Sequence, residues 1–97
     1  MTKFDSTTYG RFVAKAKAEG IRVNGNLGTR QFKVPGSKGD ALYTVLVATG
    51  DMPNEAVCNC PAGDRGIACK HAAAALSAVR KAQASKAAKV LRAAQMI

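Results

Sequence analysis

The chain has 97 residues, 47% of them hydrophobic, so one small domain over residues 1–97 is expected and little material remains for a second core. Fifteen Lys and Arg against six Asp and Glu give a net charge of +9, which favours an anionic partner. No segment approaches the roughly 20 apolar residues that cross a bilayer, and the N-terminal segment lacks a secretory signal's apolar core. We therefore expect a soluble, intracellular and cytoplasmic protein without a membrane partner.

The first predicted element is a helix over about residues 6–19. Asp5 is placed to cap its N-terminus, with Phe4 and Tyr9 at the two positions of a hydrophobic staple. Apolar residues follow at helical spacing. Gly20 is suited to end the helix, because glycine readily adopts the left-handed backbone of a helix C-terminus.

Three short strands are predicted next, as an antiparallel meander. The first covers residues 29–34, where Phe32 and Val34 lie on the same side of an alternating pattern. The second covers residues 42–49 and the third residues 55–59, and both are rich in apolar or β-branched residues. Clusters of Gly, Pro, Asp and Asn separate the strands and favour tight turns.

The C-terminal segment predicts one long helix that begins near Lys70. It is rich in Ala, Leu, Lys, Arg and Gln, all strong helix formers, and contains no Gly or Pro. At about 100° per residue, one apolar face comprises Ala72, Leu76, Val79, Ala87, Val90, Ala94 and Ile97, with Leu91 at its edge. The basic residues spread over the opposite side: Lys70, Lys81, Lys86, Lys89 and Arg92.

Three cysteines and the one histidine lie on either side of a single loop. Cys58 and Cys60 come at the end of the third strand, where alternate residues point the same way and can direct both sulfurs at one ion. Residues two apart in a helix diverge by roughly 200°, so we expect Cys69 at or before the N-cap and His71 in the first turn. The four side chains make a complete ligand set for one structural Zn²⁺, with no position left for an activated water.

Two other interpretations of these residues stay open. Free cysteines also serve as small buried hydrophobes, and a lone histidine also serves in packing. A redox C-x-C pair is the other alternative, although the C-x-x-C motif in a βαβ unit is absent. A disulfide framework is disfavoured by an odd number of cysteines in a reducing compartment. The metal interpretation accounts for all four residues together.

The loop between the two ligand pairs is suited to close over a metal. Pro61 favours an extended Cys60, and Gly63 and Gly66 allow the eight-residue loop to turn back. Three thiolates and a neutral imidazole around Zn²⁺ carry a charge of about −1. We expect the helix N-terminus, with Arg65 and Lys70 nearby, to offset this charge.

The segment CNCPAGDRGIACKH resembles a SWIM-type zinc finger, with the pattern C-x-C-x(8)-C-x-H. Pro61 after the second cysteine and Lys70 between the last two ligands also match. The resemblance covers about residues 40–80 and implies a β-hairpin and a helix clamped by zinc. The ligands that it implies are Cys58, Cys60, Cys69 and His71. It further implies DNA binding or protein–protein contacts, as in transposases, helicase-like ATPases and recombination factors, although no ATPase or nuclease motif flanks this finger.

These observations together predict an α+β fold. It is a small zinc-stapled domain with an N-terminal helix, a three-stranded antiparallel β-meander, a zinc knuckle and a long basic C-terminal helix. The first functional hypothesis is a module that binds nucleic acid, DNA in preference to RNA, with weak sequence preference. The candidate phosphate contacts are Lys70, Arg80, Lys81, Lys86, Lys89 and Arg92. The competing interpretation is that these charges only keep an Ala-rich helix solvated.

The alternative function is a protein–protein interaction adaptor. In this hypothesis the apolar face of the C-terminal helix docks a protein partner or a second copy of the chain, as a homo-oligomer, through Val79, Val90, Leu91 and Ile97. An enzyme acting on a small-molecule substrate is not expected. The histidine is assigned to zinc, the six carboxylates are scattered, and residues 25–28 are too short to be more than a turn.

Overall fold

The computed structural model describes residues 1–36 and 42–95, and the side chains of residues 1–36 and 42–85. Its helices and strands are, in chain order, β1 (Thr2–Lys3), α1 (Ser6–Ala18), β2 (Asn24–Asn26), β3 (Gln31–Pro35), β4 (Leu42–Val47), β5 (Glu55–Cys58), α2 (Pro61–Asp64) and α3 (Lys70–Gln95). The predicted α+β class, with an N-terminal helix and a long C-terminal helix, is confirmed.

The strands form one antiparallel sheet in the order β1-β5-β4-β3-β2. The predicted meander is its centre, β3-β4-β5, and the alternating residues of β3 do bury Phe32 and Val34. Two edge strands were not predicted: β1 pairs with β5, and β2 pairs with β3. The interpretation of residues 25–28 as only a turn is therefore wrong for residues 25 and 26, which belong to β2, whereas residues 27 and 28 do lie in a turn. Gly25 lies in β2 opposite Phe32, where an added Cβ would come within 2.4 Å of the Gln31 carbonyl oxygen, so no larger residue fits this pairing.

Local capping signals set the ends of α1, as predicted. The Asp5 carboxylate accepts a hydrogen bond of 2.7 Å from the Thr8 backbone N–H at the N-terminus. At the other end Gly20 has a φ of +66°, and the Ile21 N–H donates to the Ala16 carbonyl at 3.0 Å. This is the hydrogen-bond pattern of a Schellman motif, which turns the chain sharply away from the helix axis.

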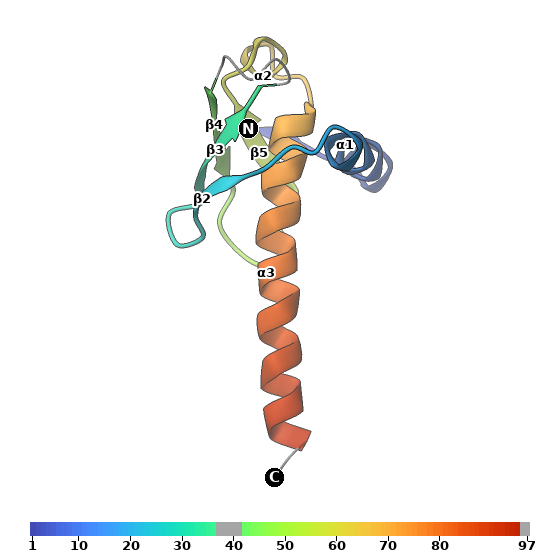
Figure 1. The fold of residues 1–97 in the computed structure, drawn as a ribbon, viewed down its shortest axis with the longest axis vertical. Helices are drawn as coiled ribbons and strands as arrows, with labels where there is room; N and C mark the ends of the chain where they lie inside the picture. Colours follow the sequence, from blue (N-terminus) through green and yellow to red (C-terminus); the bar gives the residue numbers. More distant parts are fainter. Residues whose placement is uncertain (37–41, 96–97) are drawn as a thin grey trace.

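The N-terminal part of α3 is the central layer of the domain, between the sheet on one side and α1 on the other (Figure 1). All seven residues from 71 to 77 are buried, so burial here extends all round the helix, beyond the predicted apolar stripe. The run of alanines at positions 72–75 explains this arrangement, because small side chains let both neighbouring layers approach the helix closely. The C-terminal part of α3 projects beyond the sheet and α1 (Figure 1).

The turn between β4 and β5 is held by hydrogen bonds with two side chains, Gln83 and Arg30. Gln83 of α3 accepts a hydrogen bond from the Met52 N–H at 2.7 Å and donates one to the Gly50 carbonyl at 2.9 Å. The Arg30 guanidinium donates to the carbonyls of Ala48 and Gly50, at 3.0 and 3.1 Å. These contacts fix the hairpin whose last strand carries the first metal ligand. No helix in the described ranges has the length and apolarity needed to cross a membrane.

Candidate metal centre

The four predicted metal ligands converge at one buried point. Cys58 ends β5, Cys60 caps α2, Cys69 immediately precedes α3, and His71 lies in the first turn of α3. Their sulfur and imidazole nitrogen atoms all lie within 4.8 Å of one another. The ligand atoms of a tetrahedral zinc ion, at about 2.0–2.3 Å from the metal, are roughly 3.5–3.8 Å apart. The cluster therefore has the size of a zinc site after a small contraction.

The imidazole of His71 shows most directly that a metal belongs here. Among the side chains that the structure describes, its Nδ1 and Nε2 are the only buried nitrogen or oxygen atoms without a hydrogen-bond partner. A buried polar atom without a partner is costly, and a metal ion supplies the missing partner of one ring nitrogen. Tyr43 of β4 packs beside the ring, with 4.9 Å between ring centroids, and fixes its position.

Two helix N-termini direct backbone N–H groups at the sulfurs. The Gly63 N–H donates to Cys60 Sγ at 3.3 Å, and the Ala72 N–H donates to Cys69 Sγ at 3.4 Å. The hydrogen bond from the Cys58 thiol is the main cause that lowers the pKa of Cys69, and the same bond raises the pKa of Cys58. Cys69 therefore ionises before Cys58. The N–H groups stabilise negative charge on sulfur, which zinc coordination by thiolates requires.

The loop between the ligand pairs contains a helical turn that was not predicted. Pro61 occupies the first position of α2, after an extended Cys60 with φ −70° and ψ 167°. A glycine is needed at position 63 because a side chain has no space there: an added Cβ would lie 1.8 Å from the Cys58 carbonyl oxygen. Gly66 does have the predicted left-handed backbone, with a φ of +72°. The loop thus packs its first half directly onto the end of β5.

Asn59, the residue between the first two ligands, holds the C-x-C segment against the sheet. Its side-chain Oδ1 accepts a hydrogen bond of 2.8 Å from the Thr44 N–H, and its own N–H donates to the Thr44 carbonyl at 3.2 Å. The asparagine therefore continues the pairing with β4 after β5 has ended. Sequence reasoning missed this role; the tendency of Asn side chains to replace backbone partners was the available signal.

The two residues predicted to neutralise the site, Arg65 and Lys70, lie near it in sequence and differ in their surroundings. The Lys70 ammonium forms an ion pair with Glu19 at 2.5 Å, which joins the end of α1 to the start of α3. Arg65 is exposed. At the sulfurs themselves, the N–H groups of Gly63 and Ala72 donate the hydrogen bonds described above.

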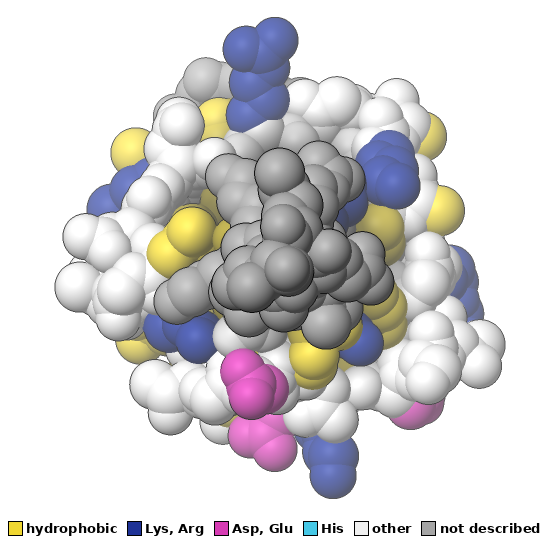
Figure 2. Space-filling model, turned by 90° about the horizontal axis from the view of Figure 1, so that it is seen from below, with side chains coloured by type: hydrophobic (Ala, Val, Ile, Leu, Met, Phe, Trp, Pro, Cys, Tyr) yellow, Lys and Arg dark blue, Asp and Glu magenta, His cyan; other side chains and the backbone are white. Residues whose placement is uncertain are grey.

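The structure separates the predicted phosphate contacts of α3 into different environments. The guanidinium carbon of Arg80 lies 4.5 Å from the centre of the Tyr9 ring, and Lys70 is paired with Glu19. Lys81 is exposed. Three further candidates lie outside the described side chains: Lys86, Lys89 and Arg92. On the face seen along α3, the basic side chains that are coloured lie apart from one another around the rim of the view (Figure 2).

The predicted docking face on α3 needs one correction. Val79 is only 1% exposed and belongs to the core, because at this level α3 is still covered by the sheet and α1. It is therefore not available to a partner. The remaining members of that face lie outside the described side chains: Val90, Leu91 and Ile97.

Comparison with known families agrees with this geometry. A family model described as SWIM zinc finger matches residues 43–80, from β4 to the middle of α3, close to the extent that the sequence predicted. No curated protein and no solved structure matches the chain. The matched region includes all four converging side chains. Residues 43–80 of this chain are therefore a SWIM zinc finger, in which Cys58, Cys60, Cys69 and His71 are the ligands of one structural zinc ion.

Proposed function

We propose that this protein binds nucleic acid, DNA in preference to RNA and with weak sequence preference, through its basic C-terminal helix, α3, which the zinc finger supports. The observation that carries the proposal is positive charge in excess, +9 over 97 residues, most of it exposed where the structure describes side chains. The exposed basic residues of the described part are Lys3, Arg11, Lys15, Lys17, Arg22, Lys33, Arg65 and Lys81. Exposed positive charge attracts a polyanion, and those side chains that contact phosphate release counterions.

In this proposal the zinc ion acts on binding only through the fold. Bound zinc crosslinks the end of β5, the α2 turn and the start of α3, and so fixes the direction in which α3 leaves the domain. Four protein ligands leave no open coordination position for substrate or activated water, so the module binds rather than catalyses.

The contacts on α3 are expected to differ in strength. In this proposal Lys81, Lys86, Lys89 and Arg92 contact phosphate. Lys81 is exposed and gives up no ion pair or ring contact seen in the described part of the chain. Lys70 and Arg80 must first give up part of their interaction with Glu19 and Tyr9, so their substitution has a smaller effect. Phosphate contacts position a protein on its ligand but read no bases, which accounts for the weak sequence preference.

The test is equilibrium binding of the zinc-loaded protein to labelled duplex DNA, single-stranded DNA and RNA of the same sequence, over a series of salt concentrations. Five neutralised phosphates give a slope of about −4.5 in log K against log salt. The variant in which Lys86, Lys89 and Arg92 are all changed to alanine is expected to lower the steepness by about 2.7.

A matched control variant distinguishes direct phosphate contacts on α3 from the general effect of the protein's net positive charge. Changing Lys3, Arg11 and Lys33 to alanine removes the same charge from β1, α1 and β3, away from the C-terminal half of α3. This variant is expected to keep most of the slope. Absence of binding at low salt contradicts the proposal, and equal effects of the two triple variants contradict the assignment of the contacts to α3.

A further inference from the structure

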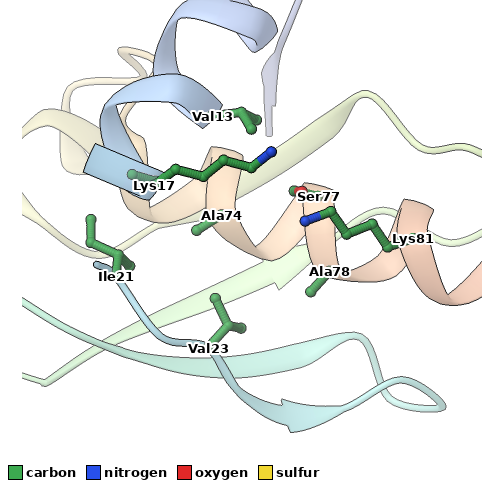
Figure 3. A pocket seen from close by; sticks show the side chains of 9 residues that line it. Val13, Lys17, Ile21, Val23, Ala74, Ser77, Ala78 and Lys81 are labelled. Carbon is green, nitrogen blue, oxygen red and sulfur yellow. The ribbon is translucent and has the colours of Figure 1, made fainter. Parts of the chain in front are cut away.

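A pocket of about 270 Å³, whose lining includes none of the metal ligands, lies between α1, α3 and the segment that leads from α1 to β2 (Figure 3). Its lining is mainly aliphatic. The aliphatic side chains are Val13, Ala16, Ile21, Val23, Ala74 and Ala78, and no aromatic ring contributes.

Two lysines from different helices border this pocket. Lys17 extends from α1 and Lys81 from α3, and their ammonium groups approach each other above Ser77 (Figure 3). Neither ammonium has a carboxylate partner among the residues that the structure describes. Two like charges that face each other across an apolar floor repel, so an anionic group bound between them is stabilising.

The chemistry of the lining distinguishes between classes of ligand. Recognition of an unstacked nucleobase uses aromatic or guanidinium planes for stacking, and this pocket offers none. Its volume of about 270 Å³ is below the usual range of small-molecule sites but suits one aliphatic side chain of a larger partner. The lysine pair favours carboxylates next to that side chain.

We propose that this pocket is a docking site for an acidic peptide segment of a partner protein. One Leu, Ile or Val side chain of the segment enters between α1 and α3, and flanking Asp or Glu carboxylates pair with Lys17 and Lys81. This binding mode differs from the nucleic-acid proposal in its apolar lining and in Lys17, which is not among the phosphate contacts assigned there, but the two proposals share Lys81. The pocket also gives the chain a site for a protein partner in place of the predicted face on α3, where Val79 is buried.

The experiment is a selection of random twelve-residue peptides, displayed on phage, against the zinc-loaded full chain. We expect enrichment of peptides in which an aliphatic residue is flanked by Asp or Glu. The most enriched peptide is then synthesised with a fluorescent label and its affinity measured by anisotropy. Charge reversal of both rim lysines, Lys17→Glu with Lys81→Glu, is expected to weaken binding by at least about tenfold.

Two further variants make the interpretation specific. Arg11→Glu with Lys15→Glu changes the net charge by the same amount on α1 but outside the pocket, and is expected to change affinity by less than about threefold. Ala78→Leu fills the pocket without a change of charge and is expected to abolish binding. Zinc content and circular dichroism establish that each variant is folded before its affinity is compared.

The proposal is overturned if selection yields no acidic and aliphatic consensus. It is also overturned if the Arg11 and Lys15 variant weakens binding as much as the Lys17 and Lys81 variant, because the attraction is then general. Amide chemical shifts of Val13, Ile21 and Val23, pocket residues that do not belong to α3, give a third outcome. If an oligothymidylate moves them and displaces the peptide, the pocket belongs to the nucleic-acid surface and the peptide assignment fails.

Discussion

The substitution Gly63→Ala adds a single methyl group at the point where α2 packs onto the end of β5. The new Cβ would lie 1.8 Å from the Cys58 carbonyl oxygen and 2.6 Å from its carbonyl carbon, whereas Cβ contacts in proteins stay beyond 3.0 Å. The neighbour is backbone of a metal ligand and cannot rotate away. The two segments must therefore separate by about 1 Å, and Cys58 and Cys60 move apart with them.

The expected cost of this separation is large for one methyl group. Overpacking of a tight site destabilises a protein by about 1–3 kcal/mol, and the backbone contact on the metal-binding segment places Gly63→Ala at the upper end, near 3 kcal/mol. Disturbance of the groups that support metal ligands typically weakens metal binding by about 10–100-fold. We therefore expect both the free energy of unfolding and the zinc affinity to fall.

Urea unfolding followed by circular dichroism gives the first quantity, and competition with a zinc-chelating dye gives the second. The matched control is Gly10→Ala in α1, where an added Cβ meets no atom within 4 Å. Alanine is the better helix former, so this variant is expected to be more stable by about 0.5–1 kcal/mol with unchanged zinc affinity. A Gly63→Ala protein that matches the wild type in stability and zinc affinity would refute the packing argument.

Two further predictions concern contacts that hold α3 in place. Gln83→Ala removes the hydrogen bonds to Met52 and Gly50, so urea unfolding should show a loss of about 1 kcal/mol; no loss would mean that the turn is held without α3. A double-mutant cycle between Glu19 and Lys70, each changed to alanine, should give a coupling free energy of about 0.2–1 kcal/mol that decreases as salt is added. A coupling that salt does not change would contradict an ion pair.

The parts of the fold that the sequence predicted depend on local signals. The ends of α1 follow from an N-cap aspartate and a left-handed glycine, which act within a few residues. The metal ligands follow from spacing, because zinc requires four donors of particular types and the three Cys and one His of the sequence make up one such set. Such features are determined before the elements pack together.

The features that the sequence did not predict depend on tertiary packing. Strands β1 and β2 have two and three residues, too few for an alternating pattern, and they exist because β5 and β3 offer free edges. Alanine is compatible with a buried or an exposed helix face, so burial of residues 71–77 on all sides was not evident. The contact between Glu19 and Lys70 joins residues 51 positions apart and has no local signature.

The most direct test of the account is removal of zinc from the metal centre, by a chelator and by Cys60→Ser. We expect native mass spectrometry to find one zinc ion per wild-type chain and none in the variant. We also expect trypsin to cleave rapidly within residues 55–75 after zinc loss, at Arg65 and Lys70, with nucleic-acid binding lost together with the fold. An unchanged circular dichroism spectrum and tryptic pattern after complete zinc removal would contradict the claim that zinc holds this structure together.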